Sequence, residues 1–225
     1  MIESKQLLKF KEKTKVIKNE GIITSCLDKT SREYRPYDPG WYLYRELNQK
    51  REKLDIFNDE FIELIYVTLS SWNMNTRAAK LAEFNAFKEL LRGNKELILS
   101  LGKFRIEGLT ESETEKVLGV MEQLFYNLKD LCHQESKVVT FSKCLHFLLP
   151  NLIVPVDRKY TLAFFGYKYN IPKELPKQFE LYQNLFLAFT ELSHNFDLKK
   201  YSKSRWNENI PKVLDNIIIG YQKLK

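Results

Sequence analysis

The sequence is poor in the residues that interrupt helices. It has only 8 glycines and 7 prolines among 225 residues, and no stretch rich in Gly, Pro or Ser divides it. Its abundant Leu, Lys, Glu, Phe and Tyr favour long helices joined by short turns over a β-sandwich or a barrel. We therefore predict an all-α protein that forms a single compact unit over residues 1–225.

Other absences bear on compartment and on metals. The cysteines, Cys26, Cys132 and Cys144, are odd in number and form no Cys-x-x-Cys pair, so we expect reduced thiols, no disulfide and no metal. No apolar run approaches the roughly 18 residues of a membrane span, and the first residues, MIESKQLLKFKEKTK, lack the apolar centre of a signal peptide. These absences predict a cytoplasmic protein without a membrane partner.

The positive charge is unevenly distributed. The net charge is +7, and residues 134–225 hold 14 Lys and Arg against 8 Asp and Glu, whereas residues 1–133 are nearly balanced. A localised positive field attracts nucleic acid or another polyanion. A solvated, lysine-rich surface is the alternative interpretation, because charged residues are mostly exposed in any protein.

Helical spacing of apolar residues, together with capping residues at helix starts, predicts helices over most of the chain. Gly21 and the Gly93-Asn94 pair are expected to end two of these helices. The expected helices cover residues 4–18, a stretch that begins at Asn58, one capped by Asn75 or Thr76, one opened by Thr110 or Ser112, and then about 138–149, 158–165, 174–194 and 210–223.

The segment REYRPYDPGWYLYREL, residues 32–47, combines aromatic side chains with turn-forming residues. Pro36, Pro39 and Gly40 predict turns, and Tyr34, Tyr37, Trp41, Tyr42 and Tyr44 lie around them. Aromatic side chains beside arginines can stack on bases. The alternative is a turn that is held by aromatic packing against the core.

One acidic residue stands out in the mostly apolar segment KVVTFSKCLHFLLPNLIVPVDRKYTLAFF, residues 137–165. Asp157 follows Pro155 and Val156 and directly precedes a predicted helix. An Asp in that place is a standard N-cap, which stabilises a helix by about 1 kcal/mol. Asp157 therefore has a structural interpretation that needs no chemistry.

The same segment resembles the active-site segment of the helix-hairpin-helix DNA glycosylase superfamily. The resemblance consists of Lys137, a helix, a proline turn, the Pro-Val-Asp of 155–157 and a second helix, with 20 residues from Lys137 to Asp157. The Pro-Val-Asp is most similar to that of oxoguanine glycosylases. The resemblance implies two helical lobes with a cleft between them, a central lobe at about 58–134 and a second lobe made of 1–57 and 135–225.

Two features of the family are missing from this chain. The residues before Lys137, DLCHQES, contain no glycine, whereas the family's hairpin uses glycines there to bring backbone amides close to a DNA phosphate. The four-cysteine iron–sulfur cluster of some relatives is also absent, so no cofactor is expected.

The resemblance implies that a DNA nucleotide is flipped into the cleft and that its N-glycosidic bond is broken, with abasic-site lyase activity as an option. Asp157 would stabilise positive charge on the sugar and accept a proton, and a lysine would attack the anomeric carbon. Lys137 is the first choice for that lysine. Lys143 is the second, because it lies six residues further along the same helix and faces another side.

Other side chains are candidates for the base pocket and for DNA contacts, each with an ordinary structural alternative. The alternative for His146 is an ordinary histidine of the core or surface. The alternative for residues 197–212 is an ordinary charged loop between two helices. Arg158 and Lys159 oppose the dipole of the helix that they begin, which favours an anionic partner. The candidates are Trp72, Phe141 and His146 for the pocket, and Arg158, Lys159, Lys199, Lys200, Lys203, Arg205 and Trp206 for nucleic acid.

A second interpretation of the whole chain remains open. A non-enzymatic α-helical domain that binds nucleic acid or another protein would also account for the helices and the basic C-terminal part, and the missing hairpin glycines favour it. The sequence indicates neither the base that would be removed nor the oligomeric state.

Overall fold

The structure is a computed structural model, and it describes residues 4–34, 37–74, 80–202 and 206–224. Within these ranges the regular elements are helices, apart from an isolated β-bridge between Leu81 and Cys132, so the predicted all-α class is confirmed. The α-helices are α1 (Lys5–Thr14), α2 (Glu20–Glu33), α3 (Pro39–Arg51), α4 (Asp59–Leu69), α5 (Phe84–Gly93), α6 (Lys95–Leu101), α7 (Glu111–Asn127), α8 (Val138–Leu148), α9 (Ala163–Phe165), α10 (Leu175–Asn195) and α11 (Ile210–Leu224). Short 3-10 or π segments are η1 (Ser70–Met74), η2 (Ile106–Gly108), η3 (Lys129–Leu131), η4 (Arg158–Leu162) and η5 (Leu198–Tyr201).

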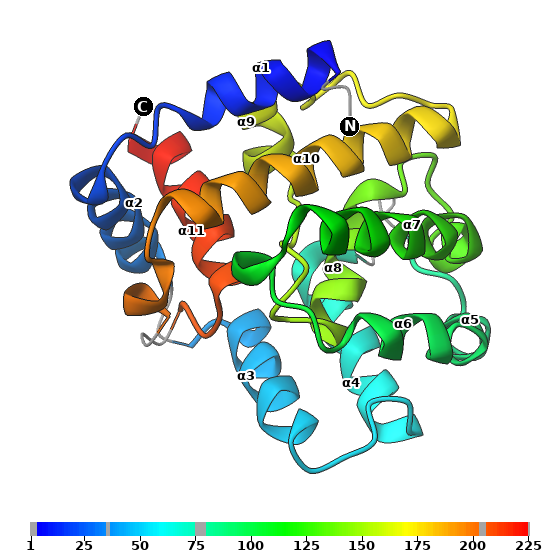
Figure 1. The fold of residues 1–225 in the computed structure, drawn as a ribbon. Helices are drawn as coiled ribbons and strands as arrows, with labels where there is room; N and C mark the ends of the chain where they lie inside the picture. Colours follow the sequence, from blue (N-terminus) through cyan, green and yellow to red (C-terminus); the bar gives the residue numbers. More distant parts are fainter. Residues whose placement is uncertain (1–3, 35–36, 75–79, 203–205, 225) are drawn as a thin grey trace.

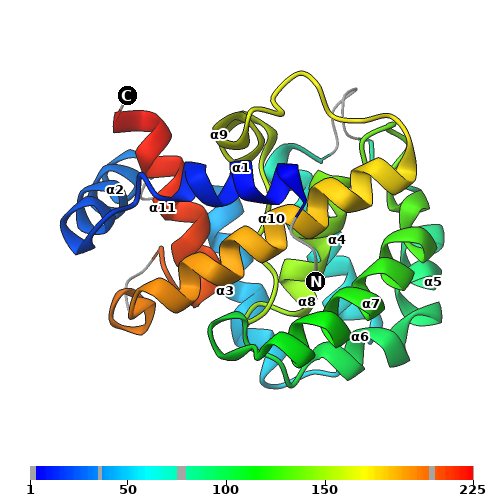
Figure 2. The same ribbon diagram turned by 45° about the horizontal axis from the view of Figure 1, so that its top comes forward.

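Helix α8 lies at the centre of the molecule (Figure 1). Each of its residues is buried, and it contacts both α4 and α10. The first and last parts of the chain meet above it, because α1 lies beside α10 and α2 lies beside α11 (Figures 1 and 2). Helix α3 packs against α4. The predicted active-site segment therefore runs through the most enclosed part of the fold.

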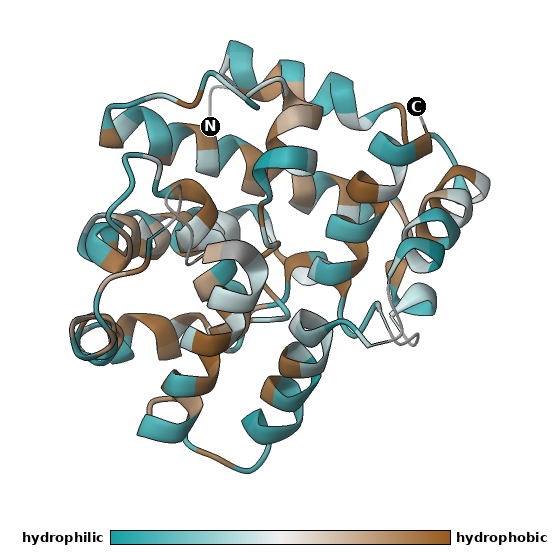
Figure 3. Ribbon diagram, turned by 180° about the vertical axis from the view of Figure 1, so that it is seen from behind, coloured by the Kyte–Doolittle hydropathy of each residue, from teal (hydrophilic) through white to brown (hydrophobic). Residues whose placement is uncertain are grey.

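One hydrophobic core joins these helices. Its buried side chains extend from Phe10 in α1 to Ile218 in α11 and include residues of both predicted lobes. The surrounding helices alternate between polar and apolar residues along their length, as Figure 3 shows, which is the pattern of amphipathic helices that cover a core. Across the ranges described above, no helix is long and apolar enough to cross a membrane.

Two local predictions near the N-terminus are wrong. Gly21 does not end a helix but lies in the first turn of α2, which Asn19 caps by accepting a hydrogen bond from the Ile22 amide. Likewise, Trp41 and Tyr44 belong to α3 rather than to a turn. Asp38 caps α3 and Pro39 occupies its first position, where the missing N–H of proline costs nothing.

Two helix starts were predicted correctly, at Asn58 and at Thr110, the latter as one of two possible caps. Asn58 caps α4 through the Phe61 amide. Thr110 and Glu113 form a complete capping box at the start of α7. The predicted cap at Asn75 or Thr76 lies outside the described residues, and α5 begins only at Phe84.

Glycine at position 220 should be required for the contact between α11 and α2. A methyl group there would overlap the backbone carbonyl of Cys26, so Gly220→Ala should destabilise the protein by about 3 kcal/mol or more. Gly119→Ala is the matched control, since a methyl group at that position in α7 would meet nothing within 4 Å beyond the backbone of its own helix, and it should stabilise by about 0.5–1 kcal/mol. Urea unfolding of both variants tests this, and equal midpoints would contradict it.

Candidate functional site

A hydrogen bond between α8 and the proline turn brings the lysine and the aspartate of this segment together. The Val156 amide donates to Ser142 Oγ at 3.0 Å, and Ser142 is fully buried. Lys143 and Asp157 are the residues that directly follow this pair, and Lys143 Nζ lies 3.6 Å from Asp157 Oδ2. The fold therefore places an amine beside a carboxylate.

The two carboxylate oxygens of Asp157 have different partners. Oδ1 accepts hydrogen bonds from the amides of Lys159 at 2.7 Å and Tyr160 at 3.1 Å, which is the predicted N-cap. Oδ2 faces Lys143. A structural role and a chemical role can therefore coexist in one side chain, because each uses a different oxygen.

Helix α11 contributes a second lysine–aspartate pair. Lys212 Nζ lies 2.5 Å from Asp215 Oδ2, and both residues are buried. The amines of Lys143 and Lys212 also share one aromatic neighbour, since their Nζ atoms lie 5.7 and 5.3 Å from the ring centre of Trp72. Both pairs therefore converge on the same indole.

Close approach of α3 holds this indole in place. Trp72 Nε1 donates to the carbonyl oxygen of Gly40 at 3.2 Å. A side chain at position 40 would not fit, because a Cβ atom there would lie 2.9 Å from Trp72 Cδ1. Gly40, which the sequence suggested to be a turn residue, instead provides the space for the central wall of the site.

These residues enclose a pocket of about 230 Å³. Six of its lining residues are aromatic, and its ionisable amines and carboxylates come from two lysines and three aspartates. The lining residues are Tyr34, Asp38, Trp41, Tyr44, Trp72, Lys143, Pro155, Asp157, Tyr160, Trp206, Lys212, Asp215 and Ile219. Such a pocket combines flat surfaces for a planar ligand with groups that can transfer protons.

The two lysines differ in their tendency to carry charge. Burial lowers the pKa of Lys143, although the carboxylates of Asp157 and Asp215 oppose the change. Burial also disfavours the charged form of Lys212, but Asp215, together with Tyr34 and Tyr44, outweighs it and raises the pKa of Lys212. The charged form is therefore less favoured for Lys143 than for Lys212.

Lys143, and not Lys137, is the lysine that meets Asp157. Lys137 Nζ donates to the Cys132 carbonyl oxygen at 2.7 Å, and Lys137 does not line the pocket. Lys137 ends up at the N-cap position of α8, where its amide donates to Gln178 Oε1 at 2.8 Å. Of the two lysines that were candidates from the sequence, the structure therefore places the second choice, Lys143, in the pocket beside Asp157.

Trp72 lines the pocket, but the other two pocket candidates do not. Phe141 is buried against Phe125, with 4.9 Å between ring centres. His146 is completely buried, and its Nδ1 donates to the Ile153 carbonyl oxygen at 2.7 Å. Its Nε2 lies 2.8 Å from Tyr44 Oη. His146 is therefore a fully hydrogen-bonded core histidine, which corrects its prediction as a pocket residue.

Among the nucleic-acid candidates that the structure describes, Trp206 lines the pocket, where it stacks on Tyr34 with ring centres 4.3 Å apart. Arg158 is exposed, and its Nε donates to the Lys168 carbonyl oxygen. Lys159 is also exposed.

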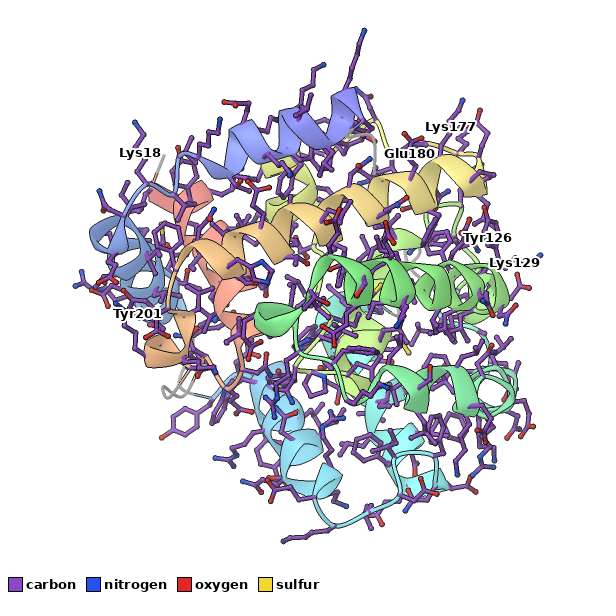
Figure 4. The ribbon with its side chains drawn as sticks, viewed as in Figure 1. Lys18, Tyr126, Lys129, Lys177, Glu180 and Tyr201 are labelled. Carbon is purple, nitrogen blue, oxygen red and sulfur yellow. The ribbon has the colours of Figure 1, made fainter. Side chains whose placement is uncertain are left out.

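The segment of residues 197–202 lies at the edge of the molecule beside α2. Lys200 pairs with Glu20 of that helix, and Lys199 is exposed. Tyr201 is visible at this edge in Figure 4. Lys203 and Arg205 lie outside the described residues.

The sequence prediction missed Lys212 and Asp215. They interrupt the apolar surface of the last helix at a spacing of three residues, within PKVLDNIII. Residues three apart lie on one face of a helix, so this interruption was the available signal. Asp38 and Tyr160 were also missed, and neither carries such a signal.

The comparisons with known proteins found no match: no protein-family model, no curated protein and no solved structure is similar to this chain. Across the described part of the chain, no group of three or more His, Cys, Asp or Glu side chains could hold a metal ion. The interpretation of the pocket therefore depends on its own residues.

Burial of His146 should make the protein sensitive to acid. Burial lowers the pKa of His146 to about 3, so between pH 6.5 and 3 the unfolded chain binds a proton that the folded chain does not. Stability is therefore lost as the pH falls, by about 1.4 kcal/mol per pH unit from this residue. His146→Gln should remove that part of the slope in urea unfolding between pH 7 and 4.5. Parallel pH curves for the two proteins would contradict this expectation.

The cap and the charge of Asp157 can be separated by two substitutions. Asp157→Asn keeps an oxygen that can accept from the amides of Lys159 and Tyr160, whereas Asp157→Ala removes it. Asp157→Ala should therefore be about 1 kcal/mol less stable than Asp157→Asn. Thermal or urea unfolding measures this difference, and equal stabilities would mean that the cap contributes little.

Proposed function

We propose that the pocket receives a nucleotide flipped out of DNA and breaks its N-glycosidic bond, with Lys143 as the nucleophile and Asp157 as the proton acceptor. The observation that carries this proposal is the contact of 3.6 Å between an amine and a carboxylate in an aromatic pocket. It keeps the reaction that the resemblance to DNA glycosylases implies and assigns the lysine role to Lys143.

The charges of the pocket fit this reaction. The pocket has three carboxylates, from Asp38, Asp157 and Asp215, and two amines. Cleavage of an N-glycosidic bond develops positive charge on the sugar, and a nearby carboxylate lowers the energy of that charge. Asp157 is the carboxylate beside the nucleophile, and its capping bonds hold it in position.

The shape of the pocket also supports a base as the ligand. A volume of about 230 Å³ is below the range for drug-sized ligands and suits a small planar group. Trp41, Tyr44, Trp72, Tyr160 and Trp206 contribute aromatic surface. Stacking on such surfaces is favourable for every base, so it contributes affinity before it contributes selectivity.

The chemical steps use the two side chains in turn. The neutral amine of Lys143 attacks C1′ of the sugar, and the bond from C1′ to the base breaks as the base leaves with the electron pair and takes up a proton. Asp157 accepts the proton that the new C1′–Nζ ammonium loses. The C1′–O4′ bond then breaks as the nitrogen lone pair forms the C=N bond, and Asp157 returns its proton to O4′, which leaves a protonated imine between Lys143 and C1′.

The imine allows strand cleavage. Loss of a proton from C2′ expels the 3′ phosphate, which breaks the C3′–O bond. Hydrolysis of the imine by water restores the amine.

The excess of basic residues in 134–225 would contact the DNA backbone outside the pocket.

Reduction with borohydride should trap the proposed imine. On duplexes that contain an abasic site or an oxidised base, the wild-type protein should form a covalent adduct that survives denaturing electrophoresis. Lys143→Met should abolish the adduct, because it removes the amine. Lys137→Met is the matched control, since Lys137 bonds outside the pocket, and it should keep the adduct.

Two outcomes would overturn the proposal: no adduct with the wild-type protein on any of these duplexes, or an adduct that persists in Lys143→Met and is lost in Lys137→Met. Salt-dependent binding to the duplex without adduct or strand change would favour the second interpretation, a helical module that binds DNA without chemistry.

A further inference from the structure

Helices α7 and α10 form a groove that shares no lining residue with the pocket around Lys143. The two helices lie side by side (Figures 1 and 2), and two hollows of about 460 and 500 Å³ follow one another along them. The lining residues recur at helical spacing, from Glu111 to Tyr126 on α7 and from Pro176 to His194 on α10. Each helix therefore contributes one continuous face to the groove.

The floor of the groove is apolar. Leu118 and Phe179, which line the same hollow from opposite helices, are 5 % and 6 % exposed. Tyr126 and Glu180, both labelled in Figure 4, line this hollow as well. From Glu111 to Tyr126, at a rise of 1.5 Å per residue, the groove is about 23 Å long, which is about four turns of a partner helix.

Gly119 is a lining residue that the packing of the chain does not explain. It lies in the middle of α7, where glycine is less favourable than alanine. A Cβ atom there would meet nothing within 4 Å beyond the backbone of its own helix, and its φ is not positive. The absence of a side chain therefore serves no neighbour within the described residues, but it lets a ligand approach the backbone of α7 closely.

The sides of the groove are acidic, although the chain as a whole has a net charge of +7. Of the five glutamates that line the two hollows, Glu191 is paired with Lys11 at 2.7 Å. Such a surface attracts a cationic partner and repels the phosphates of nucleic acid. Across the described part of the chain, no ion pair involves the other four, which are Glu111, Glu115, Glu122 and Glu180.

We propose that the groove between α7 and α10 binds a basic amphipathic α-helix of another protein. Apolar side chains of that helix lie on Leu118 and Phe179, and a small side chain faces Gly119. Lysines or arginines along its edges pair with the four glutamates. This docking surface is a function separate from the chemistry proposed for the pocket.

A helix suits the groove better than an extended strand. Strand addition requires a sheet edge with unpaired backbone N–H and C=O groups. Both sides of this groove are helices, whose interior backbone groups bond within the helix. A partner helix also satisfies its own backbone, so apolar anchors and charged edges are sufficient for it to bind.

Fluorescence anisotropy with a synthetic peptide tests the proposal. The probe is a labelled, helix-forming peptide of about 15 residues, with Leu at helical spacing, Lys elsewhere and Ala at its centre. The same peptide with Glu in place of each Lys is the charge control. The wild-type protein should bind the basic peptide at least about tenfold more tightly than the acidic one. Added salt should weaken the binding, because exposed ion pairs are screened.

Two substitutions in the groove should each weaken binding of the basic peptide by about tenfold. Gly119→Met fills the space beside the backbone of α7, and Glu122→Lys reverses a charge at the edge. Gln123→Met adds the same side chain at an exposed position of α7 outside the groove, and Glu63→Lys makes the same change of charge on α4. Both control variants should bind like wild type. Thermal unfolding checks that all four variants are folded.

Equal affinity of the wild-type protein for the two peptides would overturn the proposal, as would unchanged binding in both Gly119→Met and Glu122→Lys. Sedimentation of the protein alone provides a further test. A wild-type dimer that Gly119→Met converts into a monomer would mean that a second copy occupies the groove, and the proposal would be wrong. The peptide assay uses no DNA, and neither substituted residue lines the pocket, so its result is independent of borohydride trapping.

Discussion

The pocket depends on one hydrogen bond, from the Val156 amide to the hydroxyl of Ser142. It fixes the extended segment before η4 against α8, and the next residue on each side is a functional candidate. Because Ser142 is excluded from water, loss of its hydroxyl would leave the Val156 amide without a partner in a medium of low dielectric constant. Arg51 holds the other end of α8 by donating to the carbonyl oxygens of Phe147 and Leu148. The site is therefore built on a rigid, buried helix.

The pocket is also the place where charged side chains are buried in an otherwise apolar core. The core of this protein is apolar and aromatic, yet Lys143 is 7 % exposed with a carboxylate oxygen only at 3.6 Å. A hydrophobic side chain of similar length would be more favourable for folding at that position. Lys212 and Asp215 make a similar exception on α11. Such exceptions are characteristic of functional sites, where stability is lost for a chemical purpose.

The sequence was most informative where a local pattern decides the structure. Asn58 and Thr110 start helices through their own side chains, so nearby residues were sufficient to predict them. The start of α2 was missed because Asn19 looks like part of a loop until the helix beyond it packs on α11.

The site was predictable only in part, because a local pattern decides the place of some of its residues and tertiary packing decides the place of the others. Asp157 was found because its cap is local, whereas the choice between Lys137 and Lys143 depends on which side of α8 meets the next segment. Lys212 comes from α11 and reaches the pocket through the tertiary fold, with about 70 residues between it and Lys143 in the sequence.

The different partners of the two carboxylate oxygens of Asp157 have an evolutionary consequence. A descendant that no longer used the pocket would still need a capping oxygen at position 157, while nothing in folding would preserve a buried amine at position 143. Under the proposed function, drift would erase the lysine first, so a lysine at position 143 in a relative would indicate retained chemistry better than the aspartate does.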